Sequence, residues 1–361
     1  MARIHNFSAG PAVLPVPVLE EARSQLLEYA DTGLGLLEFS HRSKDFGEII
    51  DSARRRLSRL LALDEDQEVL FLQGGASSQF YLLPMNLLRG GRAAYLDTGR
   101  WSAKAIAEAV RFGTVDVPFR SAETGYDRVP APSWVPPLAP ETAYLHYTSN
   151  NTVAGTQFHH LPEAGPALLC CDASSDICSR PVEGSRFDLL YAGAQKNLGP
   201  AGVTVVVLRR SLLERCDPEL PTMLRYETHV RNKSLFNTPS TFGIYVIERV
   251  CAWIEEEMGG IEAVAAHNEA QARRLYDAID ATAFWAGRAQ PESRSHMNVT
   301  WTSGDDALDT IFWQEAAKEG MSGLKGHRSV GGLRASLYTA QTDQAVDALV
   351  SFMNEFERTR G

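Results

Sequence analysis

The sequence predicts an α/β fold in which a large domain has a mostly parallel sheet between helices and a smaller C-terminal domain is α+β. Short apolar segments alternate with helical patterns between residues 68 and 208, whereas the chain becomes helical and charged from Ile244. The chain has 361 residues, of which 44% are hydrophobic. This is enough to bury a large core, and the length favours two domains.

The first predicted units each join a buried strand to a helix. Residues 68–72 and 93–96 are short apolar runs that lead into polar, glycine-containing turns. A helical pattern follows each turn, and Ser102 is expected to cap the second helix at residues 103–112. Residues 114–119 then return as a strand. This alternation is typical of an α/β sheet.

Four further apolar runs extend the predicted sheet. They are nearly continuous rather than alternating, as in strands that are covered by helices on both faces. Open sheets of this class bind ligands outside the carboxyl ends of their strands. The polar residues that follow each strand are therefore the candidates for a site. The four runs are residues 142–147, 167–171, 187–192 and 202–208.

Domain boundaries are indicated by a change of pattern near Met258–Gly260. We expect a large domain over residues 16–259, and a small domain over residues 260–361 that includes the N-terminal segment 1–15. The proline-rich stretch 129–140 is expected to run over the surface. Beyond the boundary, the pattern predicts an amphipathic helix, then two strands in NVTW and LRASLY, and a last helix near 343–357.

Composition and charge exclude several classes of partner. The formal net charge is −10, and no block of Lys and Arg is longer than Arg54–Arg56, so no nucleic-acid partner is predicted. Apolar runs such as Val203–Leu208 are far shorter than the roughly 20 residues that cross a bilayer. The N-terminus also lacks an apolar signal core. We therefore expect a cytoplasmic protein that does not bind membranes.

The cysteines indicate neither a disulfide framework nor a metal site. There are five, at positions 170, 171, 178, 216 and 251, and no two form a C-x-x-C pair. Reduced thiols fit a cytoplasmic compartment. No metal is predicted.

The sharpest chemical signal is a lysine in a turn of small residues between two apolar strands, YAGAQKNLGPAG. Surroundings of low dielectric lower a lysine pKa, which would make Lys196 a competent amine nucleophile for a Schiff base. Asp172 ends another predicted strand at the same sheet edge. Pyridoxal phosphate needs both groups, a lysine for the Schiff base and an acid that keeps the pyridine nitrogen protonated. Taken singly, each residue could instead be an ordinary loop lysine and a turn or capping aspartate.

A phosphate cradle is predicted where a strand meets a Gly-Gly turn and an apolar helix, at residues 72–84. Backbone N–H groups of Gly75, Ala76 and Ser77 could hold a phosphate there, although such turns often serve only to reverse the chain. Neither a dinucleotide-binding nor a P-loop glycine pattern occurs. Trp101 could stack on a flat ring and Thr152 could contact its oxygen, or they could be a core tryptophan and a loop threonine.

Taken together, these segments resemble the phosphoserine aminotransferases, a family of fold-type I, class V pyridoxal-phosphate enzymes. The resemblance extends from end to end and includes both the lysine segment and an arginine segment. It is carried by NFSAGPAVLP (6–15), EFSHRSKDF (38–46), LQGGASSQF (72–80), HYTSNNT (146–152), CDASSDICSRP (171–181), YAGAQKNLGPAG (191–202), FNTPSTF (236–242), SRSHMNV (293–299) and GLKGHRSVGGLRASLYTA (323–340).

The resemblance implies a homodimer whose active sites are shared between subunits and contain pyridoxal 5′-phosphate. Lys196 would form the Schiff base, Asp172 would face the ring nitrogen, Trp101 would stack on the ring and Thr152 would contact its phenolic oxygen. The cofactor phosphate would be held by Ala76, Ser77 and Gln195, together with Asn237 and Thr238 from the partner subunit.

The substrate residues implied by the resemblance are cationic. His41 and Arg42 of one chain, with His327 and Arg328 of the other, would bind the substrate phosphate or the distal carboxylate of glutamate. Arg334 would pair with the α-carboxylate in a bidentate manner. The sequence departs from some family members at Ser77, where they have arginine. The roles of Ser77 and Ser78 therefore stay open.

The implied reaction transfers the amino group of L-glutamate to 3-phosphohydroxypyruvate in a ping-pong mechanism, giving O-phospho-L-serine in serine biosynthesis. The resemblance also implies that 3-hydroxy-2-oxo-4-phosphobutanoate could serve as the amino-group acceptor, in pyridoxine biosynthesis. The alternatives are a non-catalytic anion-binding protein on the same fold and another class V enzyme. A cysteine desulfurase usually has a stacking histidine where this chain has Trp101.

Overall fold

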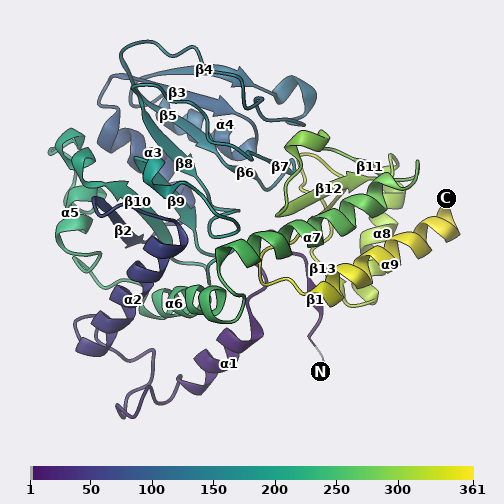
Figure 1. The fold of residues 1–361 in the computed structure, drawn as a ribbon, viewed down its shortest axis with the longest axis horizontal. Coiled ribbons are helices and arrows are strands. Elements are labelled where there is room, and N and C mark those ends of the chain that lie inside the picture. The colour runs from purple at the N-terminus through teal and green to yellow at the C-terminus, as the bar shows by residue number, and fades with distance from the viewer. Residues whose placement is uncertain (1–2) are drawn as a thin grey trace.

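The computed structural model describes residues 3–361 and contains a seven-stranded sheet with helices on both faces (Figure 1). β10 is antiparallel to both of its neighbours, and the remaining strands run parallel to one another. The predicted mostly parallel α/β sheet is therefore confirmed. In spatial order the strands are β2 (Gln67–Leu72), β10 (Thr204–Arg209), β9 (Leu189–Gly193), β8 (Leu168–Asp172), β5 (Thr142–Thr148), β3 (Arg92–Asp97) and β4 (Thr114–Arg120).

The near-continuous apolar runs arise because the sheet is buried on both faces. Val69 and Phe71 of β2 belong to one core with the helices α1 (Val16–Ser24), α2 (Lys44–Leu60) and α6 (Thr241–Glu256). Leu70 and Leu72 point to the other core, with α3 (Ala76–Leu87) and α4 (Arg100–Ala109). Successive residues of a strand face opposite sides, so both sets must be apolar.

The parallel strands end together at one edge of the sheet. Thr148 at the end of β5 pairs with Asp172 at the end of β8, and Asp172 pairs with Tyr191 of β9. Two short strands, β6 (Asn150–Asn151) and β7 (Thr156–Gln157), form a ribbon directly after β5. The turn that contains Lys196 follows β9. Residues that are far apart in the sequence therefore meet beside Asp172.

The C-terminal part has its own core and its own small sheet. The sheet consists of β11 (Ala286–Gly287), β12 (Asn298–Thr302) and β14 (Leu333–Ser336), packed with α7 (Ile261–Asp280), α8 (Asp306–Lys318) and α9 (Asp343–Arg360).

The N-terminal segment joins this second core. β1 (His5–Asn6) pairs in parallel with β13 (Met321–Ser322), and Phe7 is fully buried among C-terminal side chains. The exact domain boundaries stay a prediction.

Some local expectations were wrong or incomplete. α4 begins at Arg100 after Gly99, so Ser102 lies within its first turn rather than at its cap. The Ser102 hydroxyl still accepts a hydrogen bond from the Gly99 amide at 2.9 Å, and thus stabilises the helix start from inside. The helices α1, α2 and α5 (Tyr226–Arg231) were not predicted. None of the helices in residues 3–361 combines the length and apolar character needed to cross a bilayer.

Candidate active site

Lys196 lies in the tight turn between β9 and β10 and is 9% exposed. Its Nζ donates a hydrogen bond to Oγ1 of Thr152 at 2.8 Å. Burial lowers the pKa of Lys196 to about 8, and the positive charge of Arg334 acts in the same direction, whereas the carboxylate of Asp172 opposes the shift. A lysine in this state has a substantial neutral fraction near physiological pH and can act as a nucleophile or base.

Asp172 is the last residue of β8 and is 3% exposed. Its Oδ1 accepts hydrogen bonds from the Ser174 amide at 3.0 Å and from the Ser174 hydroxyl at 2.6 Å. Oδ2 accepts no hydrogen bond from any residue between 3 and 361 and is free to bind a ligand. Burial raises the pKa of Asp172, and the charge of Lys196 counters this effect.

Trp101 lies in the first turn of α4, beside the lysine. The Nζ of Lys196 is 5.7 Å from the centre of the Trp101 ring, which places the indole next to the reactive amine. The buried Nε1 of Trp101 has no hydrogen-bond partner in the described part of the chain. Trp101, Thr152 and Asp172 thus lie around Lys196 in one constellation, and their roles stay predictions.

The start of α3 has the shape of an anion cradle. Gly74 and Gly75 have φ angles of 98° and 71°, a region that favours glycine, and a Cβ at Gly74 would lie 2.9 Å from Cβ of Ser78. The first amides of a helix lack partners within the helix, so those of Ala76 and Ser77 are available to a phosphate. The hydroxyl of Ser78 is not available, because it donates to the carbonyl oxygen of Gly75 at 2.7 Å.

Arg334 connects the C-terminal sheet to the lysine constellation. Its Nη1 donates to the carbonyl oxygen of Thr152 at 3.3 Å, and its buried Nε has no partner within residues 3–361. Burial, and then the positive charges of Arg100 and Arg334 among others, lower the pKa of His327. The site is therefore rich in positive charge.

The structure of one chain does not bring all predicted residues into this constellation. His41 and Arg42 precede α2, and no contact joins them to Lys196 in the described chain. Asn237 and Thr238 are exposed, and the carbonyl oxygen of Thr238 accepts a hydrogen bond from Gln73 at 2.9 Å.

The carbonyl oxygen of Gln195 accepts a hydrogen bond from the Ala12 amide at 2.9 Å. The partner-subunit roles of His41, Arg42, Asn237 and Thr238, and the phosphate role of Gln195, stay predictions.

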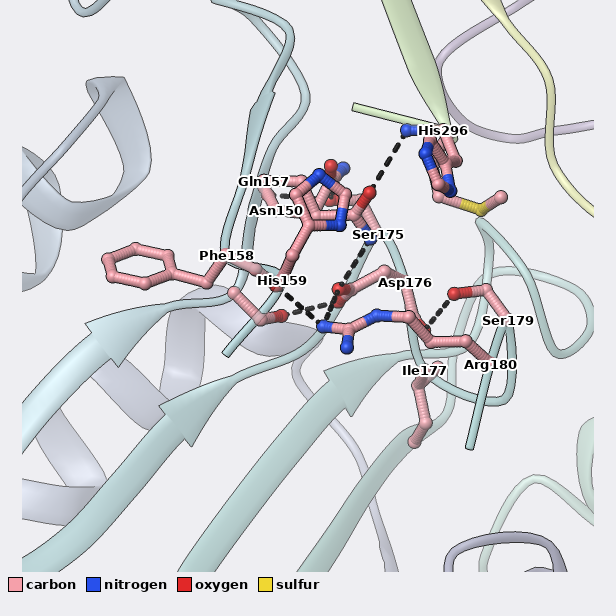
Figure 2. A network of polar contacts seen from close by, with 12 residues as sticks. Asn150, Gln157, Phe158, His159, Ser175, Asp176, Ile177, Ser179, Arg180 and His296 are labelled. Carbon is pink, nitrogen blue, oxygen red and sulfur yellow. Dashed lines mark hydrogen bonds and ion pairs between the residues drawn. The ribbon is translucent and has the colours of Figure 1, made fainter. Parts of the chain in front are cut away.

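Sequence reasoning missed a buried acid next to Asp172. Asp176 is 5% exposed and accepts hydrogen bonds from Ser149 and, at 3.1 Å, from Nε2 of Gln157. Figure 2 shows this polar network, in which the Arg180 guanidinium lies 3.7 Å from Asp176. Asp176 is four residues after Asp172 in the segment CDASSD, and a second carboxylate so close to the first was the available signal.

The described residues fit pyridoxal 5′-phosphate. They provide a carboxylate oxygen on Asp172 that has no donor within residues 3–361, an indole face, an amine of lowered pKa and the first amides of a helix. These are the groups that hold a protonated heteroaromatic ring, an aldehyde carbon and a phosphate.

Comparison with known proteins identifies the family. The profile of the family described as "Aminotransferase class-V" matches residues 4–349. The chain belongs to the class-V aminotransferases.

Within the class-V aminotransferases, this chain is similar to proteins named phosphoserine aminotransferase. It is 48% identical to a phosphoserine aminotransferase of Desulfatibacillum aliphaticivorans, over 99% of both chains. The structure of phosphoserine aminotransferase from Bacillus circulans subsp. alkalophilus superposes with a TM-score of 0.97 at 46% identity, with 99% of both chains covered. The pyridoxal-phosphate-bound enzyme from Trichomonas vaginalis gives 0.91 at 38% identity, over 98% of this chain and 100% of the other.

The family confirms the resemblance, the fold and the enzyme class that the sequence predicted. The chain is a transaminase that depends on pyridoxal phosphate. The alternative of a non-catalytic anion-binding protein is not favoured, because the family and its full-length relatives are transaminases. The individual roles of the site residues are not tested by the comparisons and stay predictions.

Proposed function

We propose that this aminotransferase transfers the amino group of L-glutamate to 3-phosphohydroxypyruvate, giving O-phospho-L-serine and 2-oxoglutarate. The single observation that carries the proposal is the environment of Lys196. Its amine is hydrogen-bonded to Thr152 and interacts with the charges of Asp172 and Arg334. The full-length similarity to proteins named phosphoserine aminotransferase supports the choice of substrate.

Each residue of the constellation has a distinct task. Pyridoxal phosphate, when bound, supplies the electron sink for charge that develops at the substrate α-carbon. Asp172 would keep the ring nitrogen protonated, and the amides of Ala76 and Ser77 would hold the phosphate group. Trp101 would support the flat face of the ring, and Thr152 would orient Lys196 through their hydrogen bond.

Lys196 moves the proton at the α-carbon. Its lowered pKa leaves roughly a tenth of the free amine neutral at pH 7. A neutral amine removes a proton from the α-carbon and can return it elsewhere in the same site, as general acid–base catalysis requires. Burial excludes bulk water from Nζ, which protects the transferred proton from exchange.

Positive charge selects the substrate. Arg334 pairs with the α-carboxylate that both substrates share, while His327 and Arg328 bind the phosphate or the distal carboxylate of glutamate. We propose that His41 and Arg42 are supplied by the partner of a homodimer, because the single chain leaves them apart from Lys196. Such a cluster attracts anions to a protein whose net charge is −10. A cytoplasmic location fits this metabolic role.

The proposal is tested by comparing kcat/KM for two phosphorylated acceptors, with glutamate as donor. The acceptors are 3-phosphohydroxypyruvate and 3-hydroxy-2-oxo-4-phosphobutanoate, and 3-hydroxypyruvate serves as the control without phosphate. We expect 3-phosphohydroxypyruvate to exceed 3-hydroxypyruvate by at least about 100-fold, since two charge-assisted hydrogen bonds to a phosphate supply roughly 3 kcal/mol. Equal values for these two would contradict the assignment.

A further inference from the structure

A second cationic cleft lies beside the active site. It encloses about 660 Å³ between α4, the segment after β4 and the C-terminal sheet. Small-molecule sites occupy roughly 300–1,000 Å³, so a metabolite of a few carbon atoms fits. The lining side chains that carry the argument are Arg100, Lys104, Tyr126, Arg288, Ser329 and Val330.

Among residues 3–361, three cationic side chains and no acidic one line the cleft. Neither Arg100 nor Lys104 makes an ion pair with any residue between 3 and 361, and no Asp or Glu lines the cleft. Arg288 donates from Nη2 to the carbonyl oxygen of Val330 at 3.1 Å, and its buried Nε has no hydrogen-bond partner in the described chain. An unpaired buried guanidinium N–H is costly unless a ligand satisfies it. The donor set is that of an anion site.

The cations that line the cleft come from two different parts of the chain. Arg100 and Lys104 are on one face of α4, and Arg288 follows β11 in the C-terminal part of the chain. A compact dianion between them would receive hydrogen bonds from both sides. Guanidinium groups bind phosphate oxygens with charge-assisted, often bidentate geometry, which favours a phosphate over a single carboxylate.

The cleft adjoins the active site but uses other residues. Ser329 lines the cleft, and its hydroxyl is 2.7 Å from Nδ1 of His327. Lys104 Nζ lies 4.7 Å from the centre of the Trp101 ring. None of Lys196, Asp172, Arg334 or His327 lines the cleft itself.

We propose that this cleft is an accessory anion site that binds a small phosphorylated organic acid beside the reaction centre. The proposal rests on the proposed function insofar as the ligand belongs to the chemical class of the phosphorylated substrate. The phosphate group is bound by Arg100 and Arg288, and Lys104 contributes further positive charge. Ser329 contacts His327. A ligand in the cleft therefore affects the loop that carries the predicted substrate residues His327 and Arg328.

The test measures binding to the cofactor-loaded enzyme by calorimetry, without turnover. The probe is 3-phosphoglycerate, which has neither an amino nor an oxo group and so cannot react. Inorganic phosphate and glycerate are tested in parallel to separate the ion from the organic acid. The variant is Arg100→Gln, because Arg100 has no partner within residues 3–361 whose loss would disturb the fold. Lys318→Gln, which removes one exposed charge on α8, is the matched control.

We expect Arg100→Gln to weaken 3-phosphoglycerate binding about tenfold or more relative to Lys318→Gln. Glycerate should not bind, and 3-phosphoglycerate should bind more tightly than inorganic phosphate. A crystal of the loaded enzyme grown with 3-phosphoglycerate should show its phosphate between Arg100 and Arg288. Equal affinities in the two variants, or density at His327 and Arg328 alone, would overturn the proposal. Failure of the proposed function would appear in the turnover assays and would leave this binding measurement unchanged.

Discussion

The amine of Lys196 donates a 2.8 Å hydrogen bond to the Thr152 hydroxyl, although the two residues are separated by 44 positions in the chain. This contact joins the turn after β9 to the segment after β5. Strand order places these two ends on either side of β8, which ends in Asp172. The sheet topology thus assembles the reactive lysine, its orienting hydroxyl and its counter-charge at one edge.

Replacing Lys196 by alanine should reduce kcat by at least about 1,000-fold, because the variant loses both the amine nucleophile and the base. Turnover is measured with glutamate and 3-phosphohydroxypyruvate. Borohydride should fix the cofactor mass on the peptide that contains Lys196 in the native enzyme and not in the variant. Lys318→Ala, an exposed change, is the control. Native-like turnover by Lys196→Ala would exclude the assigned role.

The pH dependence of Lys196 reactivity follows from its surroundings. Burial lowers its pKa to about 8, so the neutral fraction of the amine rises with pH around that value and not around 10.5. In cofactor-free protein, the rate at which Lys196 reacts with an acylating reagent should therefore level off above roughly pH 9. Peptide mass spectrometry can follow this rate residue by residue, with the exposed Lys318 as internal reference. A midpoint near the ordinary lysine value of 10.5 would contradict the expected shift.

The pH dependence of Lys196 labelling also tests whether Asp172 acts as the counter-charge of the amine. Asp172 raises the pKa of Lys196, so Asp172→Asn should move the midpoint of labelling to lower pH. The variant should also lose most of its transaminase activity, because an amide holds a proton on the ring nitrogen poorly. A shift to higher pH would mean that Asp172 does not act on Lys196 through its charge.

The sequence predicted the sheet, and it singled out Lys196 and the three residues that lie around it, because the relevant signals are local. Apolar runs mark strands that are buried on both faces, and the polar residue after each run lies at the sheet edge. The start of α4 was misplaced since Ser102 caps from inside the first turn. The cleft cations Arg100 and Arg288 were not predicted, because only the tertiary fold brings them together. Residues such as His41 cannot be placed in the site from one chain.

Arg334→Lys should raise KM for glutamate and for the phosphorylated acceptor alike, by about 10- to 100-fold. Both substrates present an α-carboxylate, and a lysine loses the bidentate geometry that is worth roughly 1.5–3 kcal/mol. Steady-state kinetics with each substrate varied in turn measures both constants. Arg273→Lys on the exposed face of α7 is the matched control. If KM rose for only one substrate, Arg334 would bind the distal carboxylate or the phosphate of that substrate instead of the shared α-carboxylate.

Asp176→Asn tests whether the polar network in Figure 2 acts on the site or only supports the fold. Asp176 accepts from Ser149, whose hydroxyl is 3.2 Å from the Asp172 carbonyl oxygen, and from Gln157, which accepts from the His296 amide at 3.0 Å. The change leaves Arg180 with a weakened partner, 3.7 Å away. We therefore expect unfolding free energy to fall by about 1–3 kcal/mol, which thermal denaturation can measure.

The carboxylate of Asp176 also raises the pKa of both Asp172 and Lys196. A purely structural role would lower stability and leave the pH midpoint of Lys196 labelling unchanged. An electrostatic role moves that midpoint to lower pH, because a negative charge that favours the ammonium has been removed. We expect the second result. Asp306→Asn, an exposed change at the start of α8, controls for the loss of one charge. If the pH midpoint of Lys196 labelling is unchanged, Asp176 only stabilises the fold and has no electrostatic effect on the site.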